Sequence, residues 1–459
     1  MNINLENNSQ HIHFVGIGGI SMSGLAEILN YEGFKVSGSD IRTSEITESL
    51  KAQGIDVIIG QKAENITEGI NIVVYTAAVK PDNPELLKAA ELNIPVIERA
   101  TLLGAIMDRY KNSIAISGTH GKTTTTSMIS EIVMAAKLDP TITVGGMLKS
   151  IGGNIRLGSS DYFVAEACEY FDSFLHFKPY VGIILNVDAD HLDYFKDLEN
   201  IRNSFHKFAG NISPQGALVI NTAVENYEEL TSGLPARVIT YGKDKNADYR
   251  ADNLQAAPNG SYSFDVYSKN GFECHIVLNV PGRHNVDNAL ATFAAAKVFD
   301  IDNKFIAEGL KNYGGTDRRF QYKGKYKNAS VVDDYAHHPT EIKATLSAAK
   351  NIEKNRLWCI FQPHTYSRTY NLLDEFSEAF NDADIIIVAD IYAAREKDTG
   401  LISSSVLAER IKARGKEALY VGDFEAIKNY IQQNIKDNDL LITMGAGDVY
   451  LIGESLVEE

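Results

Sequence analysis

The stretch AISGTHGKTTTTSMIS, residues 115–130, decides the fold of this chain, because it joins an apolar strand to a helix through a glycine-rich turn. It resembles the phosphate loop G-x-x-x-x-G-K-[ST], whose backbone amides cradle nucleotide phosphates. Residues 121–123 fit the end of that pattern, but its first glycine would fall at Ile116. Gly118 comes two residues later. The sequence therefore predicts a phosphate loop that is shorter than the common one.

A loop of this length can still bind a triphosphate. Its last amides stand at the start of a helix, where they converge on an anion and the helix dipole favours negative charge. Lys122 would reach the β and γ oxygens, and the Thr123 hydroxyl would ligate Mg²⁺. The alternative is a chance G-K-T, but this one stands at the strand–helix junction that the motif requires. We predict that ATP binds along the loop, at Gly118, Thr119, His120, Gly121, Lys122, Thr123 and Thr124.

A second glycine loop lies near the N-terminus, after the strand-like HIHFV. Residues 16–19 read Gly-Ile-Gly-Gly and nearly match G-x-G-x-x-G, but the last position holds Ser21. Asp40 follows at about the distance of a ribose-binding carboxylate. Taken alone, this pattern predicts NAD and a dehydrogenase. Because a second nucleotide loop follows, we favour a nucleotide-linked substrate at the first loop and ATP at the second.

Acidic residues follow two further strands. Glu166 lies near the end of the strand-like YFVAEAC, and Asp190 and His191 end the segment YVGIILNVDADH. The carboxyl ends of parallel strands share one edge of the sheet with the phosphate loop. Thr123, Glu166 and His191 are therefore expected to converge on Mg²⁺, which prefers oxygen ligands. The alternative role for Asp190 is to cap a helix.

The C-terminal third carries its own cluster of polar residues. Arg319, at a domain boundary, can swing onto the γ-phosphate as domains close. The stretch DDYAHHP, residues 333–339, follows a strand and is interpreted as a binding loop, because no third His or Cys completes a zinc site. Arg368 comes after the strand-like segment that ends in FQPH, and it can clamp a carboxylate.

The order of elements predicts an α/β protein of three domains. Strands alternate with helices in the first and last thirds, which is typical of doubly wound, Rossmann-like parallel sheets. The middle third is expected to be a mostly parallel, ATPase-type sheet with a small antiparallel excursion over about residues 248–280, where Asn-Gly pairs indicate hairpins. The predicted domains are residues 1–108, 109–320 and 321–459.

Composition narrows the class of protein. The chain has 459 residues and a formal net charge of −16, which argues against nucleic-acid binding. The polar N-terminus is no signal peptide, and no apolar run reaches the roughly 18 residues of a membrane span. Three widely spaced cysteines indicate no disulfide framework. We expect a cytoplasmic enzyme without membrane insertion, either a monomer or a homodimer.

Ten stretches together identify a family. They are VGIGGISMSGLAEIL, SGSD, SGTHGKTTTT, AEACEYFDSFLHFKP, NVDADHLDYF, GRHNVDNALA, DRRFQ, DDYAHHPTEI, FQPHTYSRT and AAREKDTG. In them the chain resembles the Mur ligases of bacterial cell-wall synthesis, nearly from end to end, and its short phosphate loop is the form that this family uses. The resemblance implies one domain for a UDP-sugar, one for ATP and one for an amino acid.

The resemblance also implies an activity, which is that of the alanine-adding branch. L-Alanine would be joined to the lactyl carboxylate of UDP-N-acetylmuramate through an acyl phosphate, with release of ADP and phosphate. The nearest alternative is a recycling ligase that joins a preformed tripeptide to the same sugar. From other classes, a nucleotide-sugar dehydrogenase leaves the ATP loop unexplained, and an ATP-sensing regulatory protein needs neither Glu166 nor His191.

Residue roles carry over by motif. Lys122 would bind phosphate, Thr123 and Glu166 would bind Mg²⁺, and His191 would serve a second metal. The other implied contacts are Asn285 and Asn288 with adenine, Arg319 with phosphate, Asp334 with the ATP ribose, and Tyr335, His337 and Arg368 with the amino acid. The UDP-sugar would lie against Gly16, Gly18, Gly19, Ser21, Ser39 and Asp40.

Two positions depart from the family pattern. Ligases of later steps carry a carbamylated lysine that bridges the metals, whereas a rough alignment puts His206 there with Lys207 beside it. The resemblance thus leaves the completion of the second metal site open. Many members also have an arginine directly after the histidine of FQPH, where this chain has Thr365. We therefore expect carboxylate recognition to rest more heavily on Arg368.

Overall fold

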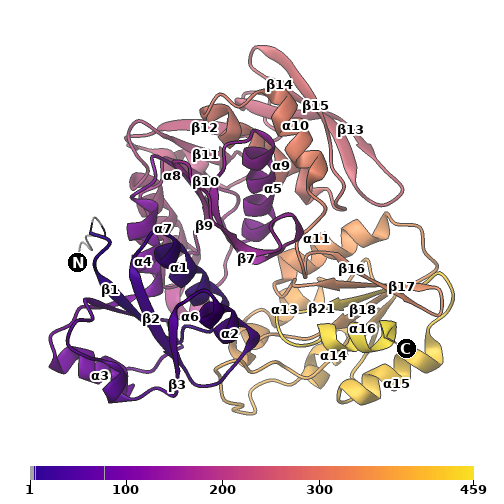
Figure 1. Cartoon of the computed structure of the whole chain (residues 1–459). Coiled ribbons are helices and arrows are strands. Elements are labelled where there is room, and N and C mark those ends of the chain that lie inside the picture. The colour runs from indigo at the N-terminus through magenta and orange to yellow at the C-terminus, as the bar shows by residue number, and fades with distance from the viewer. Residues whose placement is uncertain (1–4, 6, 77, 459) are drawn as a thin grey trace. The chain divides into compact units, whose positions relative to one another are not determined.

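Three sheets organise the chain, as Figure 1 shows for the computed structural model, which describes residues 5, 7–76 and 78–458. Two compact units are distinguished. One comprises the chain up to Thr240 together with Ala294–Ile301, and the other comprises Tyr241–Phe293 together with the chain from Asp302 onward. Among the described residues, no helix has both the length and the apolar character needed to cross a bilayer.

The first sheet is wholly parallel, with strand order β3-β2-β1-β4-β5. Its strands are β1 (His11–Val15), β2 (Lys35–Asp40), β3 (Asp56–Ile59), β4 (Ile72–Tyr75) and β5 (Val96–Glu98), and its helices are α1 (Ile20–Tyr31), α2 (Glu45–Ala52), η1 (Ala63–Asn65), α3 (Pro84–Glu91) and α4 (Arg99–Met107). The order reverses between β1 and β4, and ligands of open α/β sheets bind at such a reversal. The first glycine loop follows β1 there. The apolar run NIVVYTAAV, residues 71–79, predicts a strand here, and it includes Ala77, which lies outside the described residues.

The second sheet has the order β15-β14-β13-β12-β11-β10-β6-β9-β7-β8. Its first members in the chain are β6 (Asn112–Ser117), β7 (Thr141–Leu148), β8 (Gly153–Arg156), β9 (Tyr162–Glu166), β10 (Val181–Ile184), β11 (Ala217–Asn221) and β12 (Arg237–Tyr241). The associated helices are α5 (Lys122–Ala135), η2 (Lys149–Ile151), η3 (Tyr170–His176), α6 (Leu192–Phe195), α7 (Leu198–Gly210), α8 (Tyr227–Thr231) and α9 (His284–Val298). β6 pairs in parallel with β9 and β10, and it is almost wholly buried because its sequence NSIAIS is apolar at its centre. Such a run is typical of a central parallel strand covered on both faces.

The antiparallel excursion consists of β13 (Tyr249–Ala256), β14 (Tyr262–Ser268) and β15 (Gly271–Val277), which pair in sequence order. Both turns contain a glycine with positive φ, Gly260 at 78° and Gly271 at 116°. Glycine adopts this backbone without the steric cost of a Cβ. The hairpins predicted from the two Asn-Gly pairs are therefore confirmed.

The third sheet has the order β16-β17-β21-β18-β19-β20. Its strands are β16 (Gln321–Tyr326), β17 (Ala329–Asp334), β18 (Leu357–Phe361), β19 (Ile385–Val388), β20 (Glu417–Leu419) and β21 (Leu440–Met444). The helix α10 (Asn303–Asn312) comes before this sheet in the chain. The helices of the sheet are α11 (Pro339–Lys350), α12 (Tyr366–Asn371), α13 (Leu373–Ser377), α14 (Ser404–Ala413), α15 (Phe424–Asn434) and α16 (Tyr450–Val457).

One strand of this sheet runs against the others, which sequence reasoning did not foresee. β16 is antiparallel to β17, and the two residues between them are Lys327 and Asn328, with φ of 45° and 61°. Two-residue hairpin loops favour this left-handed backbone because it matches the twist of the strands. The sequence signal for this hairpin is weak, because the pair Lys327-Asn328 lacks the glycine that such loops usually contain.

Candidate active site

The phosphate loop forms at the end of β6, where four residues connect the strand to α5. Gly118 has φ of 136° and Gly121 has φ of 84°, so both use backbone that only glycine adopts readily. A Cβ on Gly118 would also lie 2.9 Å from Leu185 Cβ. Two glycines thus allow a loop of this length to turn from strand to helix.

Lys122, the first residue of α5, is folded back onto this loop. Its Nζ donates to Gly118 O at 2.6 Å and to Thr119 O at 3.0 Å, and it lies 2.9 and 3.2 Å from the two carboxylate oxygens of Glu169. Burial lowers the pKa of Lys122, but attraction to Glu169 outweighs it, so the pKa is raised overall. The ammonium therefore stays charged at the position where a nucleotide phosphate would need it.

The loop is braced by the segment that follows β10. Asn186 uses its side-chain amide twice on His120: Oδ1 accepts the His120 N–H at 2.8 Å, and Nδ2 donates to His120 O at 3.0 Å. Asp188 N donates to Thr119 Oγ1 at 2.9 Å, and Asp188 Oδ2 lies 3.1 Å from His120 Nε2. These bonds, across 66 to 69 residues of sequence, hold the loop in shape.

The same segment explains a difference from the predicted strand. β10 ends at Ile184, so Asp190 and His191 lie several residues beyond the strand instead of at its end. The chain leaves the sheet because Asn186 and Asp188 bond to the phosphate loop. His191 then takes a left-handed backbone, with φ of 54°, directly before α6.

Glu166 ends β9, as predicted, and lies against Gly145 of β7. The Gly145 N–H donates to Glu166 Oε1 at 2.6 Å, and a Cβ at position 145 would lie 2.7 Å from Oε2. The carboxylate is thereby held in one place. The Thr123 hydroxyl belongs to the first turn of α5 and is buried.

These residues suit a magnesium ion that is bound mainly through its substrate. Within the described part of the chain, no group of three or more His, Cys, Asp or Glu side chains forms a ready cage for a metal. Mg²⁺ usually keeps several waters and takes one or two carboxylates together with substrate phosphates. A hydroxyl from Thr123 and a carboxylate from Glu166 therefore fit this ion.

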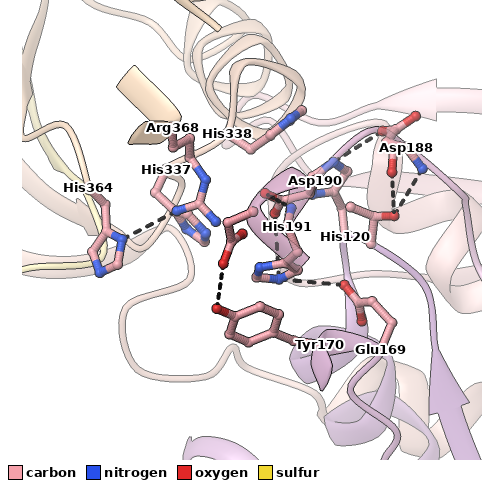
Figure 2. A network of polar contacts seen from close by, with 12 residues as sticks. His120, Glu169, Tyr170, Asp188, Asp190, His191, His337, His338, His364 and Arg368 are labelled. Carbon is pink, nitrogen blue, oxygen red and sulfur yellow. Dashed lines mark hydrogen bonds and ion pairs between the residues drawn. The ribbon is translucent and has the colours of Figure 1, made fainter. Parts of the chain in front are cut away.

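Glu169 connects the lysine to His191. Its carboxylate is 3.9 Å from His191 Nε2, and the His191 ring stacks on Tyr170 with centroids 4.2 Å apart. Figure 2 shows the imidazole beside Glu169 and Tyr170. Tyr170 is fixed in turn, because its hydroxyl donates to Asp193 at 2.7 Å. Sequence reasoning missed Glu169, although a second carboxylate three residues after Glu166 was a usable signal.

The first glycine loop is tied to the end of β2. The N–H of Gly16 donates to Ser39 O at 2.8 Å, and the N–H of Gly18 donates to Asp40 Oδ2 at 2.9 Å. The Ser39 hydroxyl is 0% exposed and donates to Glu85. Ser39 thus supports the loop through its backbone, whereas Gly19 and Ser21 are exposed at the start of α1.

In the other unit, the two asparagines of α9 lie on adjacent turns. Asn288 donates to Asn285 Oδ1 at 3.1 Å, and Asn285 donates to Pro281 O at 2.7 Å. Both side chains are buried. They form a fixed amide pair, as recognition of a planar base requires.

Asp334 organises the segment that carries Arg319. Its two oxygens accept the N–H groups of Phe320 and Ala336, each at 2.8 Å. Burial raises the pKa of Asp334 to about 6, although attraction to Arg319 and the two backbone hydrogen bonds act in the opposite direction. The side chain is 7% exposed. Its present contacts position backbone, so contact with a ribose would have to share these oxygens.

The residues expected near the amino acid lie together in this unit. Tyr335 is edge-on to His337 at 5.5 Å, and the His337 and His364 rings are 5.9 Å apart. Arg368 Nη1 lies 3.3 Å from His364 Nδ1, a contact drawn in Figure 2. The Arg319 guanidinium lies over the Tyr335 ring at 5.1 Å. Sequence reasoning mentioned His364 but gave it no role, and it missed Tyr392, which stacks on His364 at 5.6 Å.

Thr365 occupies an unusual backbone conformation next to this group. Its φ of 67° and ψ of 146° are costly for a β-branched residue, and its Oγ1 accepts the Arg368 N–H at 3.4 Å. Strain of this kind is often stored at functional sites. Thr365 thus starts the helix that carries Arg368, although it offers no second guanidinium.

His206 is occupied by a structural contact. Its Nδ1 lies 2.9 Å from Leu230 O, and both His206 and Lys207 are exposed on α7. Completion of a second metal site by this position thus gains no support from the geometry.

A short phosphate loop with a buried, charged lysine, beside fixed carboxylates in a mostly parallel sheet, defines a nucleotide-phosphate-binding α/β enzyme. Family models match almost the whole chain: "Mur ligase family, catalytic domain" over residues 11–111, "Mur ligase middle domain" over 116–296, and "Mur ligase, glutamate ligase domain" over 318–447. The chain belongs to the Mur ligase family, and the predicted three-domain α/β fold is confirmed.

Two curated relatives that match nearly the whole chain carry the same name. The UDP-N-acetylmuramate–L-alanine ligase of Agathobacter rectalis is 52% identical over 449 residues, which cover 98% of each chain. That of Acetivibrio thermocellus is 54% identical over 454 residues, covering 99% of this chain and 97% of the relative. Among solved structures, the UDP-N-acetylmuramate-alanine ligase of Thermotoga maritima is similar, with a TM-score of 0.80, 31% identity and 98% coverage of both chains.

Proposed function

We propose that this chain is an ATP-dependent ligase that joins L-alanine to the lactyl carboxylate of UDP-N-acetylmuramate and releases ADP and phosphate. The observation that carries the proposal is the phosphate loop with Lys122 buried against Glu169, which supports a site for a nucleotide polyphosphate. Relatives that are 52 and 54% identical over nearly the full length are named as L-alanine ligases, which supports the choice of substrates.

The chemistry follows from the inertness of a carboxylate toward an amine. The lactyl carboxylate attacks the γ-phosphate of ATP and forms an acyl phosphate, a transfer that needs mainly positioning and charge neutralisation. Lys122 and Arg319 supply fixed positive charge. The amine of alanine then attacks the acyl carbon, and the tetrahedral intermediate collapses with loss of phosphate. Its oxyanion needs a cation nearby.

Mg²⁺ is part of the proposal. Thr123 and Glu166 would hold it, with His191 serving a second ion, and the metal would neutralise charge on the transferring phosphoryl group. Gly145 keeps Glu166 in place, and Tyr170 keeps the His191 ring in place. The fold thus holds the side chains of Glu166 and His191 in position before the nucleotide binds.

The remaining ligands are assigned to the other clusters. The UDP-sugar would bind at the first glycine loop, with Gly16, Gly18, Gly19, Ser21 and Asp40 near it and Ser39 supporting the loop. Adenine would meet Asn285 and Asn288, the ribose Asp334, and alanine the group of Tyr335, His337 and Arg368. We place domain boundaries near residues 108 and 320.

Further parts of the proposal concern the molecule in the cell. We propose a cytoplasmic enzyme, monomeric or homodimeric, that acts on small molecules and not on nucleic acid. The net charge of −16 supports the last point. Light scattering on the purified chain measures the oligomeric state directly.

The test is phosphate release from ATP and Mg²⁺ with UDP-N-acetylmuramate, in the presence and absence of L-alanine. We expect release that needs both the sugar and alanine, and Lys122→Ala should abolish it while the protein remains folded. Release with L-alanyl-γ-D-glutamyl-diaminopimelate in place of alanine would move the chain to the recycling activity. Wild-type turnover in Lys122→Ala would overturn the assignment of the loop.

A further inference from the structure

Lys122 has no hydrogen-bonding capacity left in this structure. An ammonium has three donors. Two loop carbonyls and the Glu169 carboxylate already surround it, the closest approaches being 2.6 Å to Gly118 O and 2.9 Å to Glu169 Oε2. Glu169 is 2% exposed, so water screens the pair poorly. A bare polyphosphate would therefore meet a lysine that is already neutralised.

Glu169 also lies on the side of the site that suits a cation. It follows Glu166 by three residues, and its Oε1 lies 3.9 Å from His191 Nε2. Glu169 and Glu166 both stabilise the positive charge of Lys122, so two carboxylates act on this one ammonium. A polyanion alone adds negative charge to this group, whereas a divalent cation brought with it offsets that charge.

We propose that Glu169 makes nucleotide binding conditional on the divalent cation. It neutralises Lys122 against metal-free polyphosphate, and a cation that arrives with the nucleotide draws the carboxylate toward itself and frees the ammonium for phosphate. The inference rests on the proposed function of this loop as an ATP site. Glu169 is thus a positioning residue, which acts on the nucleotide through Lys122.

A merely structural role for Glu169 leads to a different expectation. If the carboxylate only balanced a buried ammonium, its loss would weaken binding of ATP equally with and without metal. If it sets the metal requirement, its loss changes the ratio of the two affinities. Coupling between two ligands of one protein is typically about 5- to 150-fold and is reciprocal. The ratio is therefore the quantity to measure.

The experiment compares ATP binding by calorimetry in Mg²⁺ and in EDTA, with the full chain. For wild type we expect binding about 100-fold weaker in EDTA. In Glu169→Gln we expect the ratio to fall to about tenfold or less, chiefly because affinity in EDTA rises. Glu169→Asp, which keeps the charge, should restore most of the wild-type ratio.

Glu131→Gln is the matched control. Glu131 is, like Glu169, a buried acid, but it lies on α5 and its hydrogen-bond partner is Ser150 instead of Lys122. We expect its ratio to equal that of wild type. The same ratio in Glu169→Gln as in wild type would overturn the inference, whereas wild type that binds no ATP even with Mg²⁺ would overturn the proposed function instead.

A charge-balanced variant guards against misfolding of the single substitution. Lys122→Gln with Glu169→Gln replaces the buried ion pair by two neutral groups of similar size. Because Glu169 acts through Lys122, the ratio of ATP affinities in Mg²⁺ and EDTA should be similar in the double variant and in Lys122→Gln alone. A ratio that falls in the double variant as far as it does in Glu169→Gln would overturn the proposal, because the carboxylate would then act without the lysine.

Discussion

Gly145 is the residue whose replacement should disturb Glu166, the proposed metal ligand, without unfolding the protein. A Cβ there would lie 2.7 Å from Glu166 Oε2, which is the mobile end of a side chain, so the carboxylate and not the sheet has to yield. We expect Gly145→Ala to raise the Mg²⁺ concentration needed for half-maximal activity about tenfold or more, since displacement of a ligand by a fraction of an ångström affects binding strongly. A titration of activity against Mg²⁺ measures this.

Gly153→Ala provides the control for that experiment. Gly153 belongs to the same β7–β8 hairpin, but the nearest atoms to a Cβ there are 3.9 Å away, in ordinary contact range. Its Mg²⁺ requirement should match that of wild type. Equal requirements in both alanine variants would show that Gly145 does not set the position of Glu166.

Asp334 should give the C-terminal unit a pH-dependent stability. Burial raises its pKa to about 6, above the ordinary value of about 3.9 that it regains on unfolding. The folded state therefore holds the proton more tightly, so this group favours folding below about pH 4. That contribution is lost as the pH rises through about 6. The difference corresponds to about 3 kcal/mol.

The measurement is urea unfolding between about pH 4 and 7, for wild type and Asp334→Asn. The chain has one tryptophan, Trp358, which is 0% exposed in the core of the third sheet, so its fluorescence reports this unit. Relative to the variant, wild type should lose about 3 kcal/mol of unfolding free energy as the pH rises. Parallel pH profiles would contradict the prediction.

At the scale of elements, the hydrogen bonds between the phosphate loop and the segment after β10 are the ones that should matter most for the shape of the loop. Asn186→Ala removes both hydrogen bonds to the His120 backbone, each worth about 1 kcal/mol. We expect ATP affinity to fall by about tenfold, because the loop amides lose their fixed direction. Calorimetric titration with ATP and Mg²⁺ measures the change.

Asn221→Ala tests whether any asparagine at a strand end has this effect. Asn221 ends the neighbouring strand β11, and its side chain accepts an N–H within its own turn, from Ala223. Affinity for ATP should remain within about twofold of wild type. A comparable loss in both variants would mean that Asn186 acts only through general stability.

The elements themselves were largely accessible from the sequence, but their ends were not. β6, β9 and the hairpins after β12 follow from apolar runs and Asn-Gly pairs, whose signals are local. The end of β10 depends on which partner Asn186 selects, and the antiparallel course of β16 depends on Lys327 and Asn328 without glycine. The end of β10 and the direction of β16 depend on particular side chains and their contacts. The periodicity of apolar residues does not encode these contacts.

At the scale of the whole molecule, one buried carboxylate joins several parts of the C-terminal unit. Asp439 accepts hydrogen bonds from the Arg356 guanidinium at 2.6 Å, from Trp358 Nε1 at 3.0 Å and from the Lys436 N–H at 2.9 Å. Asp439→Ala leaves these donors without their acceptor and should destabilise the unit by about 3–5 kcal/mol. Urea unfolding followed by Trp358 fluorescence provides the value.

Asp437→Ala is the comparison for this substitution. Asp437 is exposed two residues earlier in the chain, so its loss should change the unfolding free energy by no more than about 0.5 kcal/mol. If Asp439→Ala lowers the unfolding free energy as little as Asp437→Ala does, the Asp439 carboxylate does not hold these parts of the unit together.

The family and the three-domain α/β fold could be predicted from the sequence, because motifs such as SGTHGKTTTT and DDYAHHPTEI are long and specific. The roles of the supporting residues could not. Glu169 and Asn186 stand inside two of these motifs, but each acts by a contact with the phosphate loop, which lies elsewhere in the chain. Their roles are therefore identified from distances in the structure and not from the motifs themselves.

The bonds from Asn186 and Asp188 to the loop bear on protein engineering. A nucleotide loop is commonly treated as a portable cassette of strand, glycine turn and helix. Here a transplant of residues 115–130 would carry the glycines and the lysine but leave behind the amide that fixes His120. The transferable module is two segments that must travel together, and a library that varies one while freezing the other would explore mostly misshapen loops.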